Sequence, residues 1–220
     1  MKFILIIIFL SSPAYSQVSF EDYLKLKDAL YMAFDELKVD STHTLEINQP
    51  VQGFEHFWWD QPILRASYSE YSSNGIQNHF IFIFGGLAKM LDMTLDGLAL
   101  IACHELGHGL GGAPYKDSGS SQEGQADYYA TKTCLPVLFK YLVSPIQDYE
   151  VRAMEALKSS IAFYKINGDI TSISTPSTEI ATKLDSRDFF YPSAQCRLDT
   201  SINGIFQKER PVCWYPNNKF

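Results

Sequence analysis

Residues 95–110 constrain the fold more than any other stretch, because almost every side chain in them is apolar. Thr94 suits the start of a helix there, and Gly111 suits its end. A helix that is apolar on nearly all sides has to be buried, so we expect it at the centre of the protein. The titratable histidine and glutamate side chains of this stretch gather near its carboxyl end: His104, Glu105 and His108.

These three side chains have the spacing of a metal site. His104 and His108 are four residues apart, so a helix places both imidazoles on one face, about one turn from each other. Two neutral imidazoles so placed are typical zinc ligands. Glu105 follows the first ligand directly and is a candidate general base that takes a proton from the attacking water. The His-Glu-x-x-His pattern on a helix therefore predicts a catalytic zinc centre.

A catalytic zinc ion usually takes a third protein ligand. A histidine further along, as in metzincins, is excluded because position 114 is Pro. Glu123 is the predicted third ligand, and Asp127 lies on the same face of the following helix. Asp127 is expected to accept the spare N–H of a ligating histidine, His104 in the first place. Asp117 is a weaker competitor because it lies in a loop rich in Gly and Ser.

A small antiparallel sheet is expected before the apolar helix. Apolar and polar residues alternate over 63–69, and residues 79–84 are rich in Phe and Ile. Asn74 and Gly75 between them form the strongest short-range hairpin signal. The preceding polar residues 40–53 are predicted to be a loop.

Helices dominate the remaining chain. The hydrophobic periodicity predicts helices over residues 20–38, 122–141 (interrupted near Pro136) and 147–166. Residues 185–220 are predicted to be irregular and aromatic. The expected fold is therefore mainly helical α+β.

The amino terminus has the features of a signal peptide. A short positive start precedes the apolar residues 3–10 and a small-x-small site that ends at Ser16. The apolar run is much shorter than the roughly 20 residues that a membrane-spanning helix needs. We therefore expect residues 1–16 to be removed on export to the periplasm or the medium, and residues 17–220 to form one domain. The net charge of −7 argues against a duplex nucleic-acid partner.

Several motifs together resemble the gluzincin zinc metallopeptidases, and most closely the M48 group. HELGH at 104–108 followed by EGQAD at 123–127 resembles the ligand helices of that group. Residues 80–87 resemble its strand and following turn. The segment from Tyr191 to Arg197 resembles its His-Pro-Ser…Arg segment, with Tyr191 where histidine is usual.

The resemblance implies a zincin-like fold with the small sheet beside the active-site helix, one Zn²⁺ per chain, and endopeptidase activity. It implies that a polypeptide substrate lies extended along an edge strand, for which His79 to Phe84 is the expected segment. It also implies that Arg197 approaches the site. Tyr191 or Arg197 is then a candidate for stabilising the oxyanion. The departure at Tyr191 leaves one alternative: an exported, non-catalytic zinc module that binds peptides or assists assembly.

The four cysteines allow three disulfide pairings, and the sequence does not choose among them. If a metal ion joins the two ligand helices, Cys103 and Cys134 come close enough to bridge. Cys196 and Cys213 would then close the carboxyl-terminal tail. A thiolate zinc site is the alternative, although no CxxC spacing supports it and export favours oxidation.

Overall fold

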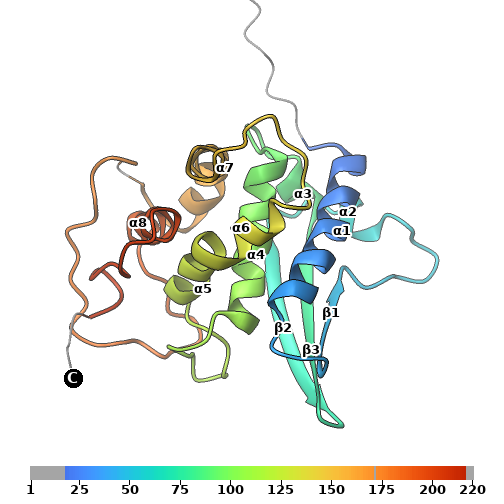
Figure 1. Ribbon diagram of the computed structural model, residues 1–220, viewed down its shortest axis with the longest axis horizontal. Coiled ribbons are helices and arrows are strands. Elements are labelled where there is room, and N and C mark those ends of the chain that lie inside the picture. Colours follow the sequence, from blue (N-terminus) through green and yellow to red (C-terminus); the bar gives the residue numbers. More distant parts are fainter. Residues whose placement is uncertain (1–17, 171, 217–220) are drawn as a thin grey trace, which may run out of the picture.

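The apolar helix predicted over residues 95–110 is the central element, α4 (Leu95–Leu110). The computed structural model describes residues 18–170 and 172–216 of the chain. Thr94 caps α4 by accepting a hydrogen bond from the Gly97 amide at 3.1 Å. In Figure 1, α4 lies between the sheet on one side and the later helices on the other. Burial all around explains why the helix tolerates so few polar residues.

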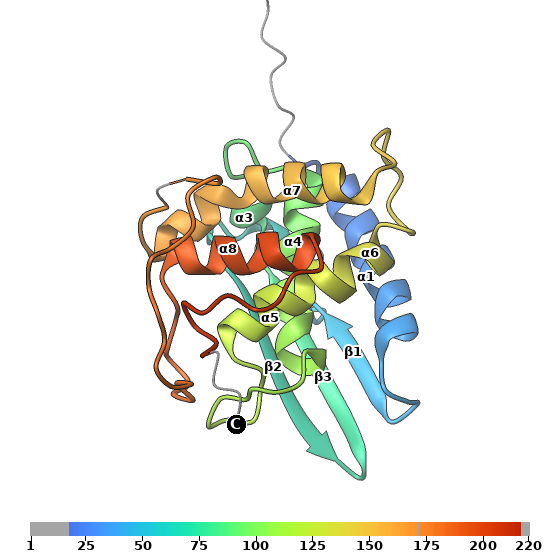
Figure 2. The ribbon, with the colours of Figure 1, turned by 60° about the vertical axis from the view of Figure 1, so that its left-hand side comes forward.

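Three longer helices pack on α4, and a fourth packs on the helix that carries the third predicted ligand. They are α1 (Phe20–Leu37), α5 (Glu123–Tyr129), α7 (Tyr149–Tyr164) and α8 (Ala194–Ile205). α1, α5 and α7 contact α4, whereas α8 packs on α5 and α7 (Figure 2). The shorter helical segments are α2 (Phe57–Asp60), α3 (Gly85–Ala88), the π-helix Ala130–Cys134, α6 (Leu135–Leu138) and the 3₁₀ turn Lys165–Asn167.

The sheet has three strands in the order β1-β3-β2 and is mixed, not antiparallel as predicted. The predicted hairpin is confirmed: β2 (Ala66–Ser73) and β3 (Ile76–Ile83) are antiparallel, and the turn residues Asn74 and Gly75 have positive φ angles of 53° and 77°. The additional strand is β1 (His43–Ile47), which runs parallel to β3 within the segment predicted to be a loop.

The position of β3 corrects the predicted substrate edge. β3, which contains most of the segment His79 to Phe84, is the central strand, because β1 covers the side that was expected to be free. A strand hydrogen-bonded on both sides has no free backbone groups for a peptide. Among the described residues, the edge strand near α4 is β2 instead.

The carboxyl-terminal region also differs from the prediction. The segment expected to be irregular contains α8, which Ser193 caps by accepting from the Cys196 amide. Most of α8 is buried, including Arg197. Its polar residues face the interior, so the sequence shows no clear apolar stripe there.

Two disulfides fix the helices, and they follow the pairing considered above for a metal ion that joins the two ligand helices. Cys103 bridges Cys134, and Cys196 bridges Cys213. The first bridge joins α4 to the π-helix that follows α5. The predicted signal peptide, residues 1–16, lies outside the described residues. None of the helices in the described part of the chain is long and apolar enough to cross a membrane.

Candidate metal centre

Two helices bring the three predicted ligands together. α4 carries His104 and His108 on one face, and α5 begins at Glu123. Gly107 lies between the histidines, where a Cβ atom would come within 2.8 Å of the Ala126 carbonyl oxygen. The glycine therefore allows the two backbones to approach, and this approach places Glu123 opposite both imidazoles.

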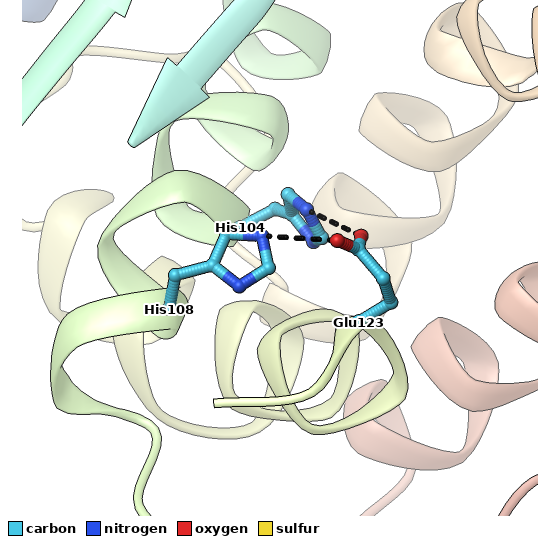
Figure 3. Close-up of side chains that lie close together, drawn as sticks. All are labelled: His104, His108 and Glu123. Atoms are coloured by element: carbon cyan, nitrogen blue, oxygen red, sulfur yellow. Dashed lines mark ion pairs between the residues drawn. The ribbon is translucent and has the colours of Figure 1, made fainter. Parts of the chain in front are cut away.

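The ligand atoms converge on one point, as Figure 3 shows. His104 Nε2 lies 3.4 Å from Glu123 Oε2, and His108 Nε2 lies 3.5 Å from Glu123 Oε1. One potential ligand atom from each residue falls within 4.8 Å of the others, and all three residues are buried. The three predicted ligands thus form a possible metal-binding triad of two imidazoles and one carboxylate.

The partners of the other ring nitrogens show that this donor set fits a divalent cation. His104 Nδ1 lies 2.8 Å from Asp127 Oδ1, as predicted, and His108 Nδ1 lies 2.9 Å from the Ser121 carbonyl oxygen. Each Nδ1–H donates to a fixed acceptor, so in the neutral ring the lone pair is on Nε2. Nε2 faces a carboxylate that is also an acceptor, and such a pair requires a proton or a metal ion between them.

Arg197 also supports Asp127. Its Nε and Nη2 atoms lie 2.7 and 2.9 Å from the two Asp127 oxygens, and Nη2 also lies 3.5 Å from Glu123 Oε2. The side chain is 3% exposed. Arg197 therefore lies beside the ligands and contacts both of these acids. The guanidinium thus holds the carboxylate that accepts from His104 Nδ1.

The surroundings of the two histidines shift their pKa values in opposite directions. Burial disfavours the charged form of both rings, but the Asp127 carboxylate outweighs burial and raises the pKa of His104 to about 9. Burial and the neighbouring His104 lower the pKa of His108 to about 3. A metal ion on His104 must therefore displace a proton that Asp127 stabilises. Burial also raises the pKa of Glu105 to about 7, close to that of an efficient general base at neutral pH.

A cleft of about 350 Å³ opens above the triad. Glu105 lies in its lining together with the ligands, and the start of β2 forms one wall. Tyr191 also lines the cleft and is 49% exposed. The negative charge of Glu123, together with partial burial, raises the pKa of the Tyr191 hydroxyl. The structure therefore places Tyr191 at the cleft as a half-exposed wall residue.

Lys116 is the cleft residue that sequence reasoning missed. Its Nζ atom lies 2.7 Å from Glu123 Oε1, and its side chain is 10% exposed. Lys116 lies in the loop between α4 and α5, where no periodicity predicts the direction of a side chain. The one sequence signal was its proximity to the ligands along the chain.

His79, which the sequence placed near the substrate edge, is only 1% exposed. Its Nε2 atom lies 2.9 Å from His43 Nδ1, and its Nδ1 atom lies 2.6 Å from the Tyr68 hydroxyl. Tyr68 in turn donates to Glu70 at 2.6 Å. We call these four residues the sheet cluster. His79 is part of the interior and does not line the cleft.

Comparison with known proteins found no matching family model, no matching curated protein and no matching solved structure.

Proposed function

We propose that the protein is an exported zinc-dependent endopeptidase of the M48-like gluzincin type. One observation carries the proposal: among the described residues, three ligands, not four, face an open cleft that Glu105 also lines. Structural zinc sites are closed by four protein ligands, whereas catalytic sites keep one position for water or substrate. The two disulfides support export, because such bonds persist in oxidising compartments.

Each residue has a role in this proposal. His104, His108 and Glu123 would hold the zinc ion, and Asp127 and Arg197 would fix the orientation of His104. Bound zinc would supply Lewis acidity toward the peptide carbonyl and the attacking water. Glu105 takes one proton from that water as its oxygen bonds to the carbonyl carbon. Glu105 then passes the proton to the amine as the C–N bond breaks, which gives a carboxylic acid and an amine. The proton of the acid then moves to the amine, so the products are a carboxylate and an ammonium group.

The substrate would lie along β2. Ala66, Ser67 and Tyr68 line the cleft, and β2 is the edge strand on this side of the sheet. An extended peptide can add to such an edge through main-chain hydrogen bonds, which depend little on its sequence.

The test compares the full chain with its Glu105→Gln variant, using cleavage of fluorescent casein and the zinc content per chain. We expect one zinc ion in both proteins and a loss of activity of about 10²- to 10⁴-fold in the variant. Glu155→Gln is a matched control, because Glu155 is 51% exposed and pairs with Lys158 on the surface of α7. A wild type that binds zinc and cleaves no more than Glu105→Gln would support the non-catalytic alternative.

A further inference from the structure

Lys116 is a nearly buried cation in the wall of the cleft, and none of the roles assigned above uses it. The side chain is 10% exposed, although a lysine rarely leaves water without a specific partner. Its Nζ atom reaches Glu123 Oε1, the carboxylate oxygen that also faces His108. Lys116 and Glu105 thus line the same cleft as the ligands.

Backbone hydrogen bonds hold the loop that carries this lysine. The Lys116 amide donates to the Ser120 carbonyl oxygen at 2.7 Å, which closes a tight turn. The Asp117 amide donates to the Ser186 carbonyl oxygen, also at 2.7 Å, and so ties the loop to the segment that precedes Tyr191. The position of the ammonium group is therefore set by the fold, which is the condition for electrostatic preorganisation.

The ammonium group retains capacity to donate. A lysine has three N–H donors and no acceptor. Within the described part of the chain, its recorded hydrogen bond goes to Glu123, so two donors remain for a group inside the cleft. A buried donor left without a partner is unfavourable, and an anionic oxygen is its strongest partner.

The other donors near the ligands are less suitable. The Arg197 guanidinium uses Nε and Nη2 in a two-point pair with Asp127, which fixes the orientation of the whole group. Tyr191 is half-exposed, and a neutral hydroxyl donates a weaker hydrogen bond than a cation does. Lys116, in contrast, is held by a single hydrogen bond to Glu123 in the described part of the chain, so its ammonium group can turn a donor toward the cleft.

We propose that Lys116 is a catalytic residue that donates a hydrogen bond to the negative charge developing on the scissile carbonyl oxygen. The proposal rests on the proposed peptidase function. In this chain Lys116 would therefore stabilise the oxyanion, the role first considered for Tyr191 and Arg197. Its positive charge lies next to a metal ligand, so Lys116 opposes zinc binding while it favours the transition state. Its removal should therefore affect the two properties in different directions.

The test is Lys116→Met, with Lys140→Met as the matched control. Lys140 pairs with Glu36 on the surface, far from the ligands in sequence and exposed to solvent. For Lys116→Met we expect kcat on fluorescent casein to fall about 10²- to 10³-fold, which is typical when one oxyanion donor is removed. KM should stay within about threefold, because an interaction made only in the transition state lowers kcat and kcat/KM together. Zinc affinity, measured by competition with a chelator, should be unchanged or higher.

The outcomes separate this proposal from the proposed function. If the wild type binds zinc but cleaves nothing, the peptidase function itself is wrong. If the wild type is active and Lys116→Met matches it, the role of Lys116 is wrong and the function stands. If Lys116→Met loses zinc affinity together with kcat, Lys116 only positions Glu123, and the catalytic role is overturned. Lys116→Gln keeps a donor to Glu123 without the charge, so it gives the same decision should Lys116→Met fail to fold.

Discussion

The protein contains two histidine pairs near the carboxyl-terminal part of α4, one in the metal centre and one in the sheet cluster, and only the first is arranged to hold a metal ion. In the metal centre, His104 and His108 use Nδ1 for protein acceptors and direct Nε2 at the Glu123 carboxylate. In the sheet cluster, both ring nitrogens of His79 are engaged, one by His43 and one by Tyr68. Burial and a nearby carboxylate are common to both, so neither identifies a metal site.

The direction of the hydrogen bonds explains the difference. Glu70 can only accept, so the Tyr68 hydroxyl donates to it and accepts from His79 Nδ1–H. His79 Nε2 then accepts from His43 Nδ1–H, and every donor in the sheet cluster meets an acceptor. In the metal centre, the lone pairs of two imidazoles face a third acceptor. A cation is needed there and nowhere along the sheet cluster.

The largest expected effect comes from removing one histidine from each pair. His108→Ala should lose zinc and all casein cleavage, because two protein ligands do not make a catalytic zinc site. His79→Ala should keep one zinc ion per chain and lose roughly 2–4 kcal/mol of unfolding free energy, through a cavity and unpaired partners. Zinc content by mass spectrometry and urea unfolding give the two readouts. Loss of zinc from His79→Ala would remove the distinction between the pairs.

The second prediction concerns the disulfide next to the metal centre. Replacing Cys103 and Cys134 by alanine should lower the unfolding free energy by about 3–4 kcal/mol, as expected for a bridge over 31 residues. It should also let a chelator remove zinc at lower concentration, because Cys103 precedes a ligand directly. The double alanine variant of Cys196 and Cys213 is the control, with a loss of about 3 kcal/mol for its separation of 17 residues and unchanged resistance to the chelator. Equal zinc loss in both variants would contradict a local effect.

The third prediction compares the carboxylate of each cluster. Asp127→Asn should weaken zinc binding about 10- to 100-fold, because it removes the negative charge that orients His104 and replaces one carboxylate oxygen with an NH2 donor. Glu70→Gln keeps the size of its side chain and should leave zinc affinity unchanged, since no ligand touches Glu70. Chelator competition at neutral pH measures both. Unchanged affinity in Asp127→Asn would mean that Arg197 and packing suffice to orient the imidazole.

The sequence predicted the ligands because each pair is encoded locally. His104 and His108 share a helix face through their spacing, and the same holds for Glu123 and Asp127 on the next helix. Gly107 allows the two helices to approach closely. The sequence shows this glycine inside the motif, but it does not show why a glycine is needed there. The periodicity of single helices was therefore enough to predict most residues of the metal centre.

The sequence did not reveal features that depend on distant pairing. β1 was predicted to be a loop because it is short and polar, and its parallel partner β3 lies far along the chain. That pairing moves β3 from the edge to the centre of the sheet and buries His79. The direction of Lys116 depends on hydrogen bonds between its loop and the segment before Tyr191, which no local pattern encodes.

The smallest expected effect is the response of each pair to pH, measured by urea unfolding in a chelator. Burial lowers the pKa of His79 below its usual 6.5, so the unfolded chain takes up a proton first as the pH falls below 6.5. The unfolding free energy of the wild type relative to His79→Asn should therefore decrease from pH 8 to pH 5.

The pKa of His104 is raised to about 9, so the contribution of His104 to the unfolding free energy is complete below pH 6.5 and is lost as the pH rises through 9. The wild type relative to His104→Asn should accordingly lose its advantage toward high pH. The two pH responses have opposite signs only under two conditions. Asp127 must hold a second proton on the His104 ring, and the sheet cluster must exclude a second proton from the His79 ring. A shift of the same sign in both variants would show that the two pairs bind protons alike, and hydrogen-bond direction would no longer distinguish them.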